Sequence, residues 1–102
     1  MIWYDNLRIG KSVGREKADL LEMGEKGEIP AHFVLITIAA NPANMLEIRS
    51  ARELRHGQKR ENMPMIIAVA GSRSEALSML TELTEECLKK TGDVSLREYL
   101  GC

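Results

Sequence analysis

Two continuous apolar runs, residues 32–40 and 63–70, constrain the fold of this 102-residue sequence more than any other feature. Both are rich in β-branched residues and lack the alternation of polar and apolar residues that marks a strand with one exposed face. Strands that are buried on both faces are typical of parallel sheets covered by helices. We therefore expect an α/β fold in which the two runs are adjacent, parallel strands joined by a right-handed crossover.

The segments around the two runs predict a third strand and several helices. Residues 3–9 alternate like an edge strand, and residues 15–23 carry apolar side chains at helical spacing. A Ser-x-x-Glu capping box at 72–75 begins a long helix that ends at Gly92, and a second box at 95–98 begins a short helix. The predicted architecture is a small three-stranded sheet flanked by helices, in the order β-α-β-α-β-α-α.

The segment 42–55 allows two interpretations. Asn41 can accept a hydrogen bond from a free backbone N–H, and Pro42 suits the first position of a helix, so we expect a helix over 42–55. In the alternative, residues 41–44 form a turn and residues 46–50 alternate as a strand of a hairpin.

Composition indicates one cytoplasmic domain, residues 1–102, without a cofactor or a metal. The formal net charge is -1, so no overall field draws the chain to nucleic acid or to an anionic membrane. The first residues lack the pattern of a secretory signal, and the longest apolar run is too short to cross a bilayer. The chain has two cysteines and no C-x-x-C pattern, which gives no basis for a disulfide framework or a zinc site.

Three short stretches carry a resemblance to other proteins. They are the strand end Ala39-Ala40-Asn41-Pro42, the strand 66–71, and the helix start Ser74-Glu75-Ala76-Leu77. Together they resemble a group of short uncharacterised proteins from anaerobic Firmicutes. The resemblance implies no activity, and no catalytic residue is transferred from it.

The first candidate site is the turn that follows the second apolar run, formed by Gly71, Ser72, Arg73 and Ser74. A turn between the carboxyl end of a parallel strand and the start of a helix offers backbone N–H groups and a helix dipole to an anion. If the strands are parallel, Asn41 lines the neighbouring rim. The turn matches neither the nucleoside-triphosphate loop nor the dinucleotide glycine pattern. The alternative interpretation is a well-capped helix with a tight turn.

A second candidate is a basic surface for a partner. Five Lys and Arg residues face one acidic residue between positions 49 and 60, which suits an acidic protein surface or a second copy of the chain. Trp3 and Tyr4 are candidate interface anchors on the edge strand. The alternative is a solvated charged face, with the two aromatic residues packed in the domain. The basic residues of this surface are Arg49, Arg52, Arg55, His56, Lys59 and Arg60.

No arrangement of nucleophile, acid and base at a diagnostic spacing is present, so the sequence favours a binding module over an enzyme. We expect a protein-interaction or regulatory module that forms a homodimer, because a small sheet leaves strand edges unpaired. The alternative is a binder of a small anion or a phosphate-containing ligand at the turn 71–74. Nucleic-acid binding is disfavoured, since the basic segment contains no aromatic residue for base stacking.

Overall fold

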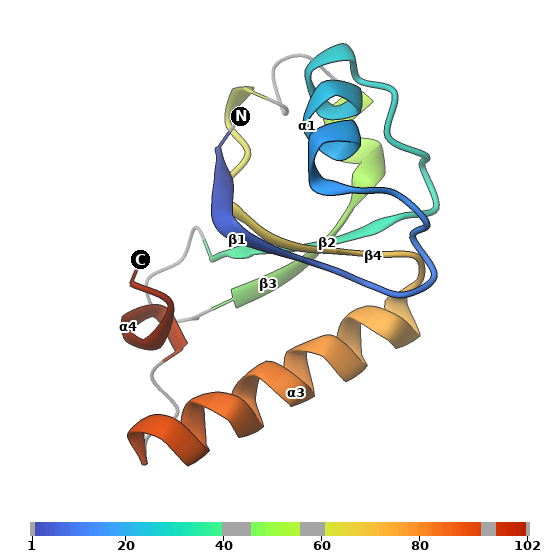
Figure 1. Ribbon diagram of the computed structural model, residues 1–102. Helices are drawn as coiled ribbons and strands as arrows, with labels where there is room; N and C mark the ends of the chain where they lie inside the picture. The colour runs from blue at the N-terminus through green and yellow to red at the C-terminus, as the bar shows by residue number, and fades with distance from the viewer. Residues whose placement is uncertain (1, 40–45, 56–60, 93–95, 102) are drawn as a thin grey trace.

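A four-stranded mixed sheet lies between two layers of helix (Figure 1), in a computed structural model that describes residues 2–39, 46–55, 61–92 and 96–101. The spatial order of the strands is β1-β4-β2-β3. β4 pairs parallel with β1 and antiparallel with β2, and β2 pairs antiparallel with β3. The α/β class is confirmed, whereas the sheet has four strands instead of the predicted three. The strands are β1 (Trp3–Ile9), β2 (Val34–Ile38), β3 (Leu46–Ser50) and β4 (Ile66–Ala70).

The two apolar runs are adjacent strands, but the predicted parallel direction is wrong. Val34 at the start of β2 lies opposite Ala70 at the end of β4, and Ile36 lies opposite Ala68. β2 and β4 are the central strands and are covered on both faces, and such burial produces a continuous apolar run whether the neighbouring strands are parallel or antiparallel. The strand adjacent to β4 in the parallel direction is β1. The predicted shared rim between the ends of the two runs therefore does not form.

The predicted helix over 42–55 is also wrong, and the strand of the alternative interpretation is confirmed at 46–50, while its turn at 41–44 lies outside the described residues. β3 occupies 46–50 and pairs with β2 over five residues, followed by a short 3-10 helix, η1 (Ala51–Arg55). Leu46 and Ile48 pack with the sheet face toward the long helix, where they meet Ile36 and Ile38 of β2. This cross-strand packing outweighs the local preference for a helix. The observed element order is β-α-β-β-η-β-α-α.

The helices at the ends of the chain follow their predicted boundaries closely. α1 (Lys17–Lys26) ends at Gly27 with φ 68°, and α3 (Arg73–Thr91) ends at Gly92 with φ 72°, in the left-handed region that glycine favours. Ser72 caps α3 by accepting a hydrogen bond from the N–H of Glu75 at 3.2 Å. The short terminal helix is α4 (Leu96–Leu100). None of the helices in the described ranges has the length and apolar character needed to span a bilayer.

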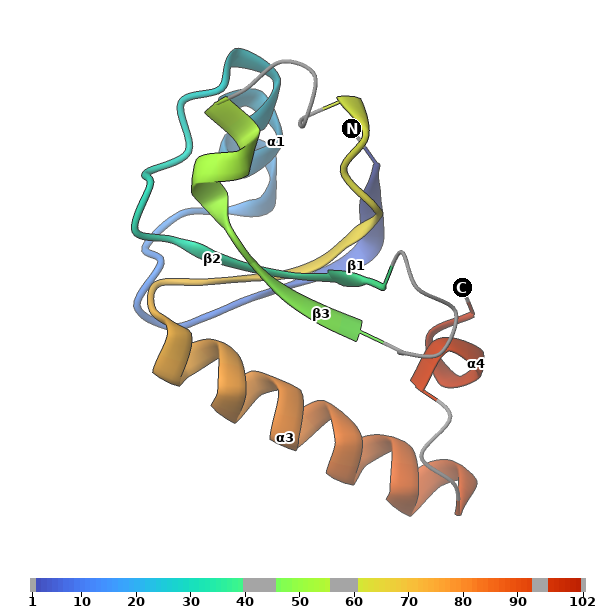
Figure 2. The ribbon, with the colours of Figure 1, turned by 180° about the vertical axis from the view of Figure 1, so that it is seen from behind.

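Each face of the sheet carries its own core (Figure 2). On one face, Leu20 of α1 and Leu54 of η1 pack with Leu35, Ile66 and Val69 of the sheet. On the other face, α3 and α4 cover the sheet, and their buried residues Ala76, Leu83, Cys87, Leu96 and Leu100 line the second layer. Cys87 is fully buried, as its position on the apolar stripe of α3 predicts. The central strands are covered on both sides, which leaves β1 and β3 as the edges.

Candidate functional site

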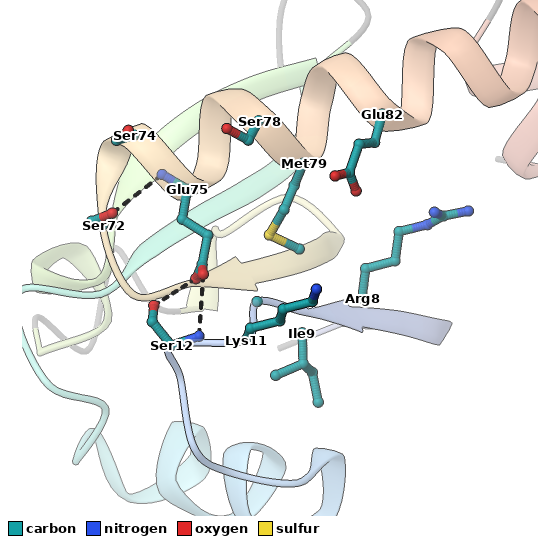
Figure 3. A pocket seen from close by; sticks show the side chains of 11 residues that line it. Arg8, Ile9, Lys11, Ser12, Ser72, Ser74, Glu75, Ser78, Met79 and Glu82 are labelled. Atoms are coloured by element: carbon teal, nitrogen blue, oxygen red, sulfur yellow. Dashed lines mark hydrogen bonds between the residues drawn. The ribbon is translucent and has the colours of Figure 1, made fainter.

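The carboxyl ends of β1 and β4 lie side by side at the same end of the sheet, because these two strands are parallel and adjacent. Each strand ends in a glycine, Gly10 or Gly71, and the N–H of Gly10 donates to the carbonyl of Val69 at 2.8 Å. The turn after β1 brings Ser12 beside Gly71, and the turn after β4 leads directly into α3 (Figure 3). Backbone N–H donors and the N-terminus of α3 therefore converge at this end of the sheet.

The carboxylate of Glu75, in the first turn of α3, occupies these donors. It accepts from the N–H of Gly71 at 2.8 Å, from the N–H of Ser12 at 3.1 Å and from the Ser12 hydroxyl at 2.8 Å. The hydrogen bond from Gly71, followed by that from the Ser12 hydroxyl, lowers the pKa of Glu75 below its ordinary value. An internal anion thus sits where the sequence predicted an external one.

Two glycines make room for this carboxylate. A Cβ on Gly10 would lie 2.0 Å from Glu75 Oε1, and a Cβ on Gly71 would lie 2.1 Å from the Ser12 Oγ. Both distances are far below van der Waals contact, so any larger residue would displace the side chain that it meets. The glycines are needed here for close approach and not for an unusual backbone angle, since neither has positive φ.

An open cavity of about 550 Å³ lies beside the Glu75 contact, between β1 and α3. Two cations, Arg8 and Lys11, and two carboxylates, Glu75 and Glu82, line it together with Met79 (Figure 3). The lining charges have both signs, so the cavity has no single electrostatic preference. Four serines also line it, namely Ser12, Ser72, Ser74 and Ser78.

The predicted anion-site residues are only partly brought together. Gly71 and Ser72 lie at the Glu75 contact and Ser74 lines the cavity, whereas Arg73 is exposed and does not line it. Asn41 lies outside the described residues, and β2 ends at the opposite end of the sheet from Gly71.

The sequence did not predict that Gly10 and Ser12, in the turn after β1, belong to the contact with the Glu75 carboxylate. The capping box at 72–75 was identified, but the Glu75 carboxylate bonds to the N–H of Gly71 and not to that of Ser72. A Gly-x-Ser pattern directly after the first strand was the only local signal, and it has no meaning until the strand order is known.

A second contact ties the same edge strand to α3. Both terminal nitrogens of Arg8 donate to the Glu86 carboxylate, at 3.0 and 3.1 Å, and the Tyr99 hydroxyl of α4 also donates to it. The hydrogen bonds from Arg8 and Tyr99 lower the pKa of Glu86 to about 2. The hydrogen bonds that Tyr99 and Arg8 each make with Glu86 raise the pKa of both of these residues. α3 thus holds β1 through two carboxylates, Glu75 and Glu86.

Among the described residues of the predicted basic surface, Arg49 is paired with carboxylates, whereas Arg52 and Arg55 are exposed. Arg49 forms salt bridges of 3.0 Å with both Glu47 and Glu53, and the side chain of Arg55 donates to the carbonyl of Ile29 at 3.4 Å. Arg52 is exposed. The predicted excess of basic residues covers positions 49–60 and so leaves out Glu47, which a strand places on the same face as Arg49. His56, Lys59 and Arg60 lie outside the described residues.

The two predicted interface anchors on β1 face the interior. Trp3 packs partly buried against the core on the α1 side, and Tyr4 packs against the α3 side, where its hydroxyl donates to the Leu100 carbonyl at 2.8 Å. Neither ring is presented on an open surface. These aromatic side chains hold the edge strand to the two cores.

The other edge of the sheet, β3, has a different character. Within the described ranges no strand pairs with its outer side. Two large apolar side chains on one flank of α3 are exposed, Leu77 at 47% and Leu88 at 50%. The residues on the opposite flank of α3, Glu75 and Glu86, contact β1, so the helical period directs the leucine flank toward the β3 side.

Comparison with known proteins adds no functional assignment: no family model, no curated protein and no solved structure matches the chain. Among the described residues, no group of three or more His, Cys, Asp or Glu side chains could hold a metal ion.

Proposed function

We propose that the protein is an interaction module that self-associates through the surface formed by β3 and the leucine flank of α3, defined here as Leu77 and Leu88. The observation that carries the proposal is an edge strand whose outer side is unpaired in the described structure, together with large apolar side chains exposed on the flank of α3 that faces away from β1. Exposed edges and apolar patches together are typical of association surfaces.

The half-buried side chains of β3 support the same surface. Leu46 and Ile48 are only partly covered, although they lie on the sheet face that α3 packs against. Further burial of these side chains on association is favourable, at roughly 25 cal/mol for each Å² removed from water. The leucine flank of α3 would add apolar area to the same contact.

The alternative function, binding of a small anion at the turn 71–74, receives less support. The donors that such an anion needs, the N–H groups of Gly71 and Ser12, already bind the Glu75 carboxylate. An incoming anion must displace this carboxylate, whose negative charge would otherwise repel it.

The test is the oligomeric state of the wild-type chain, measured by sedimentation equilibrium over about a hundredfold range of concentration. We expect a reversible shift from the 11.4 kDa monomer to twice that mass. A single monomeric species at every concentration would contradict the proposal.

A further inference from the structure

The outward-facing groups of β3 can be assigned from its pairing with β2. The N–H of Ala51 donates to the carbonyl of Phe33 at 3.0 Å, so this pair is hydrogen-bonded. Hydrogen-bonded and non-bonded pairs alternate along an antiparallel ladder. The N–H and C=O groups of Leu46, Ile48 and Ser50 therefore point away from β2, toward the open side.

A second copy can pair with this edge in an antiparallel direction about a two-fold axis, and only a few registers bring outward groups together. With Ile48 opposite Ile48 of the partner subunit, Leu46 faces Ser50 of the partner subunit and Glu47 faces Arg49 of the partner subunit. A shift of the axis by one residue in either direction places Glu47 against its own copy, or Arg49 against its own copy. Like charges directly opposite each other are destabilising, so the charges select the register centred on Ile48.

We propose that a second copy of this chain is the partner, and that two β3 strands pair antiparallel in the register centred on Ile48. This inference rests on the proposed self-association and specifies its geometry. The pairing joins the two four-stranded sheets into one continuous sheet and is isologous, as a two-fold dimer requires. Two Glu47–Arg49 contacts form across the axis, one on each side.

The state of Arg49 in the monomer fits this register. Its Nε is buried and has no hydrogen-bond partner within the described part of the chain, while its two terminal nitrogens bind Glu47 and Glu53. The register places the carboxylate of the partner's Glu47 directly across from Arg49, in a non-bonded pair whose Cα atoms lie about 4.5 Å apart. Each terminal nitrogen of Arg49 carries two hydrogens and makes one bond in the described monomer, so the guanidinium group has donors left for this carboxylate.

The opposite edge is less suited to the same pairing. β1 has a register irregularity between Trp3 and Arg8, and within this stretch the carbonyl of Asp5 already accepts from the ammonium group of Lys17. Bulges and lysines on an edge strand are devices that block edge-to-edge association. β3 pairs with β2 over five consecutive residues without a shift, which gives a regular template.

Charge reversal tests the register. In the Glu47→Arg variant both cross-axis contacts become Arg–Arg, and in the Arg49→Glu variant both become Glu–Glu. We expect each variant alone to raise the dimer dissociation constant at least about tenfold. An equimolar mixture of the two should restore association as a heterodimer, because every cross-axis contact is again of opposite sign.

The doubly reversed chain, Glu47→Arg with Arg49→Glu, separates this register from its neighbours. It restores opposite charges only where residue 47 faces residue 49, so we expect it to form homodimers. In a register shifted by one residue, residue 47 or residue 49 faces its own copy, so like charges stay opposite each other in every variant. A double variant that associates no more tightly than the two single variants would therefore contradict the register centred on Ile48.

Two matched controls carry the same charge changes outside the pairing. Arg52→Glu changes an exposed arginine of η1, and Glu85→Arg changes an exposed glutamate of α3. Both should keep the wild-type dissociation constant, and circular dichroism should show that every variant is folded.

The two levels of the proposal fail in different ways. Wild type that stays monomeric refutes self-association itself. Wild type that dimerises while both single variants keep its dissociation constant refutes the β3 register and leaves self-association intact. Should one single variant fail to fold, the other single variant is compared with the double variant, and equal dissociation constants for these two refute the register.

Discussion

The two edges of the sheet differ in how the rest of the chain treats them. β1 is held to α3 by the carboxylate of Glu86, the turn after β1 is held by that of Glu75, and the carbonyl of Asp5 in β1 accepts from Lys17. On β3 the charged groups bind neighbours in the adjoining sequence, where Arg49 bridges Glu47 and Glu53. Contacts with residues far away in the sequence hold β1 in place. β3 is regular, and no described strand pairs with the N–H and C=O groups on its outer side.

The difference teaches that the location of charge in a sequence says little about its role until the partners are known. From the sequence, Glu75 is only the second partner of a capping box, yet its carboxylate holds the turns after β1 and β4, and Glu86 binds Arg8 of β1. The arginines near position 50 look like a free basic surface, yet the best-placed of them is already paired. Breaking the contacts on one edge should therefore change stability, and breaking those on the other should change association.

The largest effect on stability is expected from Glu75→Ala. The substitution removes the acceptor of the N–H groups of Gly71 and Ser12, and because water can reach this site we expect a loss of about 0.5–1.5 kcal/mol, the net contribution of an ordinary hydrogen bond. Urea unfolding of the two proteins measures the difference. Glu82→Ala is the control, because Glu82 lines the same cavity and is exposed. An equal loss of stability in both variants would contradict the role assigned to the Glu75 contact.

The same variant also tests the anion alternative. Removing the Glu75 carboxylate uncovers backbone donors at the N-terminus of α3, so inorganic phosphate should raise the melting temperature of Glu75→Ala and leave wild type unchanged. A shift of equal size in wild type would instead favour the binding of a small anion to the native turn.

A smaller effect, dependent on pH, is expected from the Glu86 contact. The pKa of Glu86 is lowered from 4.5 to about 2 in the folded protein, so its contribution to stability is complete above about 4.5 and is lost as the pH falls toward 2. In Glu86→Gln the fall in unfolding free energy over this interval should be less steep. Glu85→Gln, an exposed neighbour on α3, should follow wild type. Parallel curves for wild type and Glu86→Gln would show that the contact with Arg8 does not persist in solution.

The smallest effect on stability is expected on the leucine flank. Leu77→Ser and Leu88→Ser alter side chains that are 47% and 50% exposed, and surface changes of this kind stay within about 0.5 kcal/mol. Thermal unfolding of diluted protein measures this. The dissociation constant of the dimer should nevertheless rise, since these side chains belong to the proposed association surface. A loss of stability as large as that of Glu75→Ala would show that the flank supports the fold itself.

The boundaries of α3 could be predicted from sequence because its end signals are local. Ser72 binds an N–H three residues away, and Gly92 ends the helix through its own left-handed backbone. The strand at 3–9 was predicted for the same reason, since its alternation places Trp3 and Tyr4 on opposite faces within a few residues. Features that depend only on residues close together in the sequence can be predicted without knowledge of the fold.

The strand directions and the Glu75 contact could not be predicted, because both depend on distant partners. Apolar runs report that β2 and β4 are covered on both faces, and this property is the same for parallel and antiparallel neighbours. The bond from Ser12 to Glu75 joins two turns far apart in the sequence. The segment 46–50 is a strand because Ile36 and Ile38 of β2 lie opposite it, a cause that its own residues do not reveal.

The placement of β1 has a consequence for how the chain folds. β2 and β3 are near neighbours in the sequence, whereas β1 must find β4 across most of the chain, with Trp3 opposite Ile66. Closing a long loop costs more entropy than closing a short one, so the hairpin assembles early and the amino-terminal strand docks late. The chain contains a single tryptophan, and it lies in that late strand. Its fluorescence therefore follows the final step of folding, while far-ultraviolet circular dichroism follows the earlier ones.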